Sequence, residues 1–131
     1  MPDVVSTRPL LDKLGVKPGA RVALINIDDA EFRRLLAQRT QDITEGEPLP
    51  GSDLVFVGVD DGPELLQLPA LRQRIVSNGS IWVVSRKGRL ATIRDIDVIE
   101  AAKSSGLVDN KVVSFSASHT SLRLVIPLAL R

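Results

Sequence analysis

The 131-residue sequence contains no cysteine and a single histidine, His119. The missing thiols exclude disulfides, thiolate metal sites, iron–sulfur clusters and cysteine nucleophiles. One imidazole also excludes a zinc site built from several histidines. No metal site is therefore predicted from thiolates or imidazoles.

Aromatic rings and net charge are scarce as well. The chain has three phenylalanines, one tryptophan and no tyrosine, and its 17 basic and 16 acidic residues leave a formal charge of +1. Proteins that read nucleic acid concentrate positive charge and commonly stack bases on aromatic rings, so no nucleic-acid partner is predicted. No stretch resembles a signal peptide or reaches the length of a membrane span, so we expect no membrane partner and a cytoplasmic location.

The remaining composition is that of a globular protein, with 44% hydrophobic and 25% charged residues. A chain of this length buries enough surface for one core, so we predict a single domain over residues 1–131. Three nearly continuous apolar runs have the length of strands that are covered on both faces. These runs are residues 21–27, 53–59 and 81–85.

Helix signals follow each of these predicted strands. An acidic or hydroxyl residue with an acid three positions later is the spacing of a capping box at a helix start. The pairs with this spacing are Asp28 with Glu31, Asp61 with Glu64, and Thr92 with Asp95.

Proline and glycine punctuate the segments between strands. Pro69 divides residues 63–76 into two helical pieces, because proline is not accommodated inside a helix. Asn78-Gly79 is typical of a left-handed helix exit. The turn-rich residues 40–52 are expected to be mostly loop, with one short edge strand near residues 41–44.

The C-terminal part has a different pattern. Residues 112–116 and 122–126 flank the turn-rich residues 117–121, and the second of these runs alternates apolar and other side chains, which predicts a hairpin. Strand–helix units that finish in a hairpin predict an α/β three-layer sandwich, with parallel strands followed by a C-terminal antiparallel hairpin.

Residues 16–24, 53–57 and 77–84, together with this hairpin, resemble the framework of a class I S-adenosylmethionine-dependent methyltransferase. Residues 17–22, 106–112 and 121–125 are similar, more specifically, to a small bacterial domain family of unknown function. The resemblance implies a methyltransferase-like (Rossmann-like) fold. In its sheet the three apolar strands are neighbours in chain order, followed by the last strand and then the penultimate one, with any short second strand outside the first.

The resemblance does not extend to the cofactor loop. Methyltransferases approach their cofactor with glycines after the first strand, but here that loop reads Asn26-Ile27-Asp28-Asp29-Ala30, and no glycine occurs between Gly19 and Gly46. The family's acid for the ribose hydroxyls has candidates only in the predicted loop, at Asp42, Glu45 and Glu47. No cofactor is therefore predicted.

These observations favour a non-catalytic or degenerate methyltransferase-like domain that binds a small ligand or a protein partner. S-adenosylmethionine-dependent methyl transfer is the first alternative, and an anion or nucleotide binder the second. No catalytic residue is assigned, since fold alone does not carry chemistry.

A ligand site is expected at the carboxyl ends of the parallel strands, where open α/β sheets form their crevice. The predicted ligand-binding residues are Asn26, Asp28, Asp60, Ser85 and Lys87.

Other interpretations stay open for several of these residues. Carboxylates from neighbouring strands could hold Mg²⁺, but Asp28 and Asp61 fit helix capping better. The basic loop of residues 86–89 could bind an anion or be solvated. His119 is expected to be an exposed surface histidine in a hairpin turn, since no G-x-S-x-G elbow accompanies its serines. Trp82 is expected in the core.

The C-terminal residues 126–131 are mostly apolar, and the mean hydropathy of the chain is +0.10. An apolar tail either folds back onto its own sheet or covers a partner, and a symmetric homodimer is the common way to bury such a patch. We slightly favour the dimer.

Overall fold

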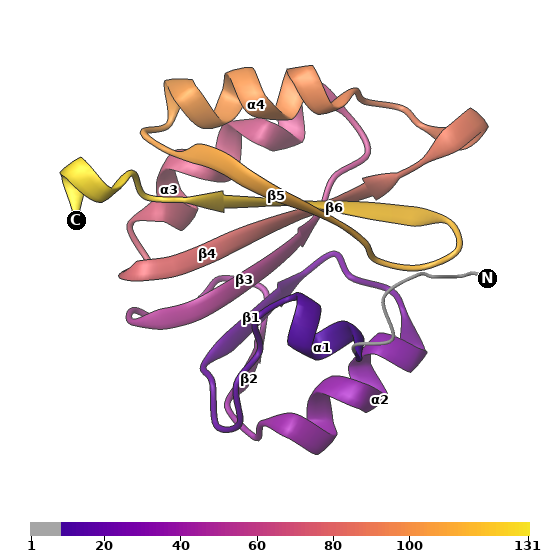
Figure 1. Ribbon diagram of the computed structural model, residues 1–131, viewed down its shortest axis with the longest axis vertical. Coiled ribbons are helices and arrows are strands. Elements are labelled where there is room, and N and C mark those ends of the chain that lie inside the picture. Colours follow the sequence, from indigo (N-terminus) through magenta and orange to yellow (C-terminus); the bar gives the residue numbers. More distant parts are fainter. Residues whose placement is uncertain (1–8) are drawn as a thin grey trace.

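The computed structural model describes residues 9–131, which build a six-stranded sheet of order β2-β1-β3-β4-β6-β5 (Figure 1). β2, β1, β3 and β4 are parallel, whereas β6 runs antiparallel to both β4 and β5. This order confirms the predicted methyltransferase-like sheet, including the short second strand outside the first. The strands are β1 (Val22–Ile25), β2 (Ile43–Glu45), β3 (Ser52–Gly58), β4 (Ile75–Arg86), β5 (Val108–Ser114) and β6 (His119–Val125).

Helices cover both faces of the sheet and give the three layers expected. α1 and α2 lie on one side, and α3 and α4 lie on the other (Figure 1). The bounds are α1 (Leu10–Lys13), α2 (Ala30–Arg39), η1 (Gly62–Gln67), α3 (Leu68–Arg72), η2 (Gly88–Leu90), α4 (Asp95–Ser104) and η3 (Leu128–Leu130).

The hydrophobic core consists of two clusters, one on each face of the sheet. Val55 and Val57 of β3 pack toward α3 and α4, while Leu54 and Phe56 of the same strand pack toward α1 and α2. Successive strand residues point to opposite faces, so a strand that is covered on both sides needs apolar residues at every position. This burial explains why the central strands read as continuous apolar runs.

Trp82 lies in the core, as predicted, with its side chain fully buried on the α1 face of β4. Its indole Nε1 donates a hydrogen bond to the backbone oxygen of Leu14, at 3.1 Å. This bond satisfies the one polar atom of the buried ring and fastens the end of α1 to the sheet.

Two of the three predicted helix starts need correction. α2 is capped by Asp29, whose Oδ1 accepts from the backbone nitrogen of Phe32 at 2.9 Å, so the assignment of the cap to Asp28 was wrong. The helix begins one residue later than the acid spacing indicates, after a bend at Asn26, which adopts a left-handed conformation (φ 57°).

Of the other two predicted caps, one is confirmed and one is wrong. The capping box of Asp61 and Glu64 is confirmed, with both reciprocal hydrogen bonds formed. Thr92 does not cap α4, because the chain is still irregular there. The carboxylate of Asp97 instead accepts from the backbone nitrogen of Arg94, at 2.9 Å.

β4 is longer than predicted, and Asn78-Gly79 lies inside it rather than at a helix exit. The pairing of β3 with β4 shifts register between Ser52 and Leu54. A Cβ on Gly79 would stand 3.0 Å from the backbone oxygen of Asp53. The glycine therefore permits two strands to approach closely at an irregularity of the sheet. The Asn-Gly dipeptide occurs both at such irregularities and in turns, so the sequence alone did not separate the two.

The hairpin is confirmed with shifted bounds, since β5 begins at Val108 and β6 already begins at His119. α1 is a short helix of four residues, Leu10–Lys13, that follows Pro9, the first described residue. Within residues 9–131, no helix is long and apolar enough to cross a membrane.

Candidate functional site

A pocket of about 360 Å³ opens at the carboxyl ends of β1, β3 and β4. β1 lies between β2 and β3, so the strands that follow β1 in the sequence are added on opposite sides of it. Open α/β sheets form their binding crevice at such a reversal of strand order. We call it the switch pocket. It is lined by Asn26, Ile27, Asp28, Asp29, Gly58, Val59, Asp60, Val84, Arg86, Phe115, Ser118 and His119.

Asn26 and Gly58 bring the ends of β1 and β3 together at this pocket. The backbone of Asn26 is left-handed, and its Nδ2 donates to the backbone oxygen of Gly58 at 3.4 Å. A Cβ on Gly58 would stand 2.2 Å from the backbone oxygen of Asn26, so only glycine fits. Gly58 was not among the predicted site residues, although a glycine inside an apolar strand run was a usable signal.

The three acidic residues of the switch pocket differ in the hydrogen bonds and ion pairs that they form. Asp29 caps α2, and Asp60 Oδ1 lies 3.4 Å from Arg86 Nε. Asp28 makes no hydrogen bond or ion pair with any residue from 9 to 131, and its charge contributes to raising the pKa of Arg33 after the larger effect of Glu45. The described part of the chain contains no group of three or more metal-ligating side chains.

Ser85 and Lys87 are not in the pocket lining. Ser85 is buried on β4, on the opposite face from the pocket residues Val84 and Arg86. The Nζ atom of Lys87 donates to the Oγ atom of Ser114 at 2.7 Å. The structure thus brings Asn26, Asp28 and Asp60 together and leaves the other two predicted ligand-binding residues outside. Ligand binding by any of the five remains a prediction.

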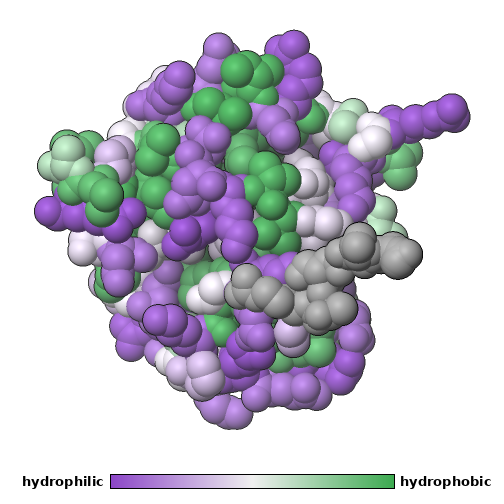
Figure 2. Space-filling view, viewed as in Figure 1, coloured by the Kyte–Doolittle hydropathy of each residue, from purple (hydrophilic) through white to green (hydrophobic). Residues whose placement is uncertain are grey.

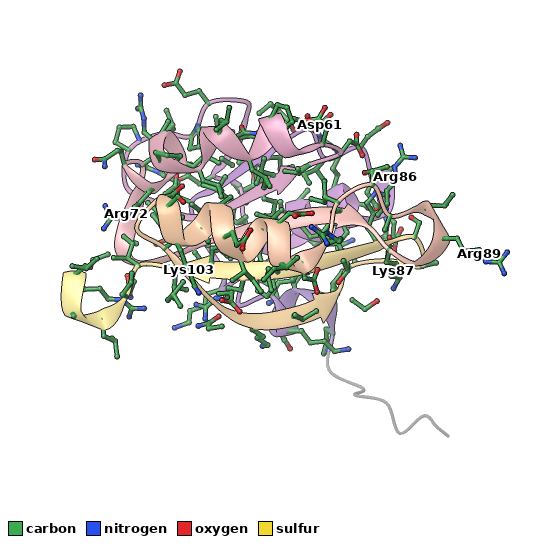
Figure 3. The ribbon with its side chains drawn as sticks, turned by 90° about the horizontal axis from the view of Figure 1, so that it is seen from above. Asp61, Arg72, Arg86, Lys87, Arg89 and Lys103 are labelled. Atoms are coloured by element: carbon green, nitrogen blue, oxygen red, sulfur yellow. The ribbon has the colours of Figure 1, made fainter. Side chains whose placement is uncertain are left out.

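Arg86 and Arg89, at the two ends of the basic loop, differ in position. Arg86 is the last residue of β4 and faces Asp60, whereas Arg89 extends away from the body of the molecule (Figure 3). The sequence interpretation treated the loop as one basic unit and did not separate Arg86 as a pocket residue.

His119 is half-buried and lines the switch pocket, which corrects its predicted place on an exposed hairpin turn. It is the first residue of β6 and pairs with Arg86 of β4. Its Nδ1 shares a 2.7 Å hydrogen bond with the Oγ atom of Ser118. The turn ends at Ser118, three residues before the end of the predicted turn at Ser121, and this places His119 in the sheet.

Polar and apolar groups both line the switch pocket, and the polar groups contribute most of its accessible surface. Four buried hydrophobic side chains, each less than a tenth exposed, form what we call its floor. The mixture offers a ligand both apolar surface and hydrogen-bonding groups. The floor residues are Ile27, Val59, Val84 and Phe115.

Arg33 of α2 decides whether this fold's usual cofactor could be held here. Its Nε donates to the backbone oxygen of Ile27 at 2.8 Å, inside the loop between β1 and α2. Its Nη1 and Nη2 both donate to the carboxylate of Glu45 at the end of β2, the second of these bonds being 2.9 Å long. One guanidinium therefore links the loop after β1 with the end of β2, the two segments that the family resemblance places around the cofactor.

Glu45 is the acid at the end of β2, the place where the family resemblance puts the ribose ligand. The Arg33 guanidinium holds the pKa of this carboxyl below its ordinary value, and it occupies both carboxylate oxygens. The loop after β1 also has no glycine to let a ligand approach its backbone. The residues present do not fit S-adenosylmethionine. The acid that would bind its ribose, Glu45, is already paired with Arg33, and the loop after β1 lacks the glycines that would let the cofactor approach.

Solved structures with a similar fold are S-adenosylmethionine-dependent methyltransferases. An enzyme of this class from Aquifex aeolicus has a TM-score of 0.64 at 12% identity, over 89% of this chain and 87% of that one. Magnesium protoporphyrin IX methyltransferase from Synechocystis, with S-adenosylmethionine bound, has a TM-score of 0.60 at 11% identity, over 89% and 74%. An O-methyltransferase from Thermotoga maritima has a TM-score of 0.57 at 10% identity, over 88% and 63%. At these identities the likeness shows the fold alone.

No curated protein matches the sequence significantly. A family model does match, over residues 11–128, and its description is "Protein of unknown function (DUF3052)". The match spans both hydrophobic clusters and every strand of the sheet. The chain therefore belongs to this family of unknown function, and it has the fold of the class I methyltransferases.

Proposed function

We propose that this protein is a non-catalytic ligand-binding domain, which keeps the methyltransferase framework and uses the switch pocket for a small molecule other than S-adenosylmethionine. The observation that carries the proposal is the Arg33 fork, which engages Glu45 and the Ile27 backbone where the cofactor would be held. A pocket of about 360 Å³ remains beside it, at the lower end of the range of small-molecule sites.

The lining of the switch pocket supports a ligand with one apolar face and hydroxyl or amine groups at its edge. The Phe115 ring and the aliphatic floor suit the apolar face. The carboxylate of Asp28 has no hydrogen-bond donor among the described residues, so it suits a donor group of the ligand. Arg86 and His119 offer further polar contacts in the same pocket.

A thermal-shift panel of nucleosides, polyols and small aromatic amines tests this proposal. A ligand of the switch pocket raises the Tm of the wild type by mass action, and Asp28→Asn reduces this rise because it removes the unpaired acceptor charge. Asp95→Asn, an exposed carboxylate at the start of α4, is the matched control and keeps the full rise. A compound that raises the Tm of Asp28→Asn and Asp60→Asn as much as that of the wild type binds outside the switch pocket. If every active compound behaves in this way, the proposal is contradicted.

Methyl transfer is the competing function, and the solved neighbours favour it through their shared fold. It requires saturable binding of S-adenosylmethionine, whereas the ligand-binding proposal requires none. The anion or nucleotide binder remains open at the basic loop. Lys87→Ala should weaken binding of a phosphate ligand there, and unchanged affinity would dismiss this alternative.

A homodimer is part of the proposal. In the C-terminal tail, Leu128 is 79% and Leu130 60% exposed, and Figure 2 shows hydrophobic residues at the place of this tail, at the left of the view. Apolar side chains left in solvent favour a partner surface. A cytoplasmic location, which the sequence analysis expects, is proposed as well.

A further inference from the structure

Arg123 of β6 is a guanidinium that has no anionic partner within residues 9–131. It stands in register with Trp82 of β4 and Lys111 of β5, and directly paired residues of a sheet share a face, so it belongs to the α1 side. Among residues 9–131, no side chain forms an ion pair or a hydrogen bond with it. By contrast, Arg21, Arg33, Arg39 and Arg74 each pair with a carboxylate.

The surroundings of Arg123 make this lack of a partner unfavourable. The residue is half-buried, and burial lowers the pKa of its guanidinium. The positive charge of Arg131 lowers it further. Polar and charged groups that lose water are normally compensated by a hydrogen bond or an opposite charge, and neither is present here.

Arg123 lines a second pocket, of about 430 Å³, at the amino ends of the strands. We call it the α1 pocket, because the end of α1 and the turn before β1 form one wall. Lys17 brings a second cation from that turn, and Asn78 brings a side-chain amide from β4. The α1 pocket lies at the end of the sheet away from the switch pocket and shares no residue with it.

One carboxylate, that of Asp53, also lines the α1 pocket. Its Oδ2 accepts a hydrogen bond from the backbone nitrogen of Arg21, at 2.9 Å. It forms no ion pair with Arg123 or Lys17, and two cations therefore face one carboxylate that is already engaged. The pocket therefore has an excess of positive charge, and the half-buried Arg123 guanidinium has no acceptor among residues 9–131.

We propose that the α1 pocket binds the oxyanion of a small molecule, a phosphate or carboxylate group held by the Arg123 fork with Lys17 as the second cation. The planar guanidinium matches two oxygens of such a group at once. The volume exceeds that of a single oxyanion, so the group is one end of a larger molecule. The site is separate from the proposed function of the switch pocket.

Calorimetric titrations of pyrophosphate and citrate into the full chain, at constant ionic strength in chloride, test this site. We expect one of these anions to bind saturably, and Arg123→Gln to weaken it at least tenfold. Arg89→Gln, which removes an exposed arginine from η2, is the matched control and binds as the wild type does. Binding of pyrophosphate alone assigns a phosphate ligand, and binding of citrate alone a carboxylate. Binding of neither in the millimolar range, or equal binding by Arg123→Gln, overturns the proposal.

Stability of the ligand-free protein gives an independent readout. Because Arg123 is partly desolvated and repelled by Arg131, Arg123→Gln should raise the Tm in chloride buffer while abolishing the further rise that the anion causes. A guanidinium with only a structural role would give the opposite sign. A Tm below that of the wild type would therefore overturn the proposal, since it would mean that Arg123 has stabilising contacts of its own.

Discussion

At the scale of the residue, Gly58 sets how closely β1 and β3 approach beside the switch pocket. Its missing side chain leaves room for the backbone oxygen of Asn26, which a Cβ would approach to 2.2 Å. Backbone cannot yield as the end of a flexible side chain can, so the substitution must displace a strand end. The pocket's shape therefore depends on a residue that contributes no chemistry of its own.

Gly58→Ala is expected to lower the free energy of unfolding by about 1–3 kcal/mol, the usual cost of overpacking. Gly62→Ala is the matched control, because a Cβ there meets nothing within 4 Å, and it should change stability by less than about 0.5 kcal/mol. Urea unfolding of both variants measures the difference. Equal stabilities would show that the two strand ends are not in contact as described.

The pair of Arg33 and Glu45 predicts a dependence of stability on pH. The pKa of Glu45 lies below its ordinary value of 4.5 because Arg33 donates to it. A depressed folded-state pKa contributes stability that is present above the unfolded pKa and is lost as the pH falls through the folded pKa. With Glu45 59% exposed, the contribution is small and is screened by salt.

Glu45→Gln should therefore be less stable than the wild type at about pH 6, and the difference should shrink toward about pH 3 as the native carboxylate is protonated. Urea midpoints at low ionic strength measure both values. A difference that stays constant with pH would mean that the ion pair contributes nothing to folding, and this would weaken the case that Arg33 holds Glu45.

At the scale of the element, α2 begins at its cap, and Asp29 rather than Asp28 forms that cap. Asp29→Ala should destabilise the protein by about 1 kcal/mol, the typical cost of a lost N-cap. Asp28→Ala, one residue away, removes no hydrogen bond among the described residues and should leave the unfolding midpoint nearly unchanged. Thermal unfolding of the pair distinguishes them, and the reverse order of stability would restore the cap to Asp28.

The elements that sequence patterns predicted well are those whose burial is uniform. β1 and β3 are covered on both faces, so their apolar runs stand out without any knowledge of the neighbours. Asn78-Gly79 was misinterpreted because a strand irregularity and a helix exit use the same residues. The cap was predicted at Asp28 because Glu31 follows it by three residues, but the helix begins one residue later than this spacing indicates.

The candidate site was predictable only in part, for a similar reason. Asn26, Asp28 and Asp60 follow strands directly, so parallel pairing brings them to one edge. Ser85 lies near the end of β4, but its side chain points to the face away from the pocket. Lys87 follows β4, but its Nζ atom contacts Ser114 instead. The contact of Arg33 with Glu45 was not predicted, because the short strand was expected near residues 41–44, whereas β2 extends to Glu45.

At the scale of the whole molecule, the exposed tail predicts self-association. Deleting residues 128–131 removes Leu128 and Leu130, the exposed apolar side chains of η3. Sedimentation at micromolar concentration should show a dimer of the 14.2 kDa chain that the deletion converts to a monomer. A wild type that sediments as a monomer would refute the dimer, and a dimer that survives the deletion would move the interface elsewhere.

Under the proposed function, this methyltransferase framework no longer binds S-adenosylmethionine and uses the switch pocket for another ligand. Calorimetric titration of S-adenosylmethionine and S-adenosylhomocysteine into the wild-type chain measures whether the cofactor still binds. Because Arg33 holds Glu45 and the loop after β1 lacks glycine, we predict no saturable heat for either compound. Saturable binding of either compound with a Kd below about 100 μM, which is over about 5 kcal/mol of affinity, would contradict the account.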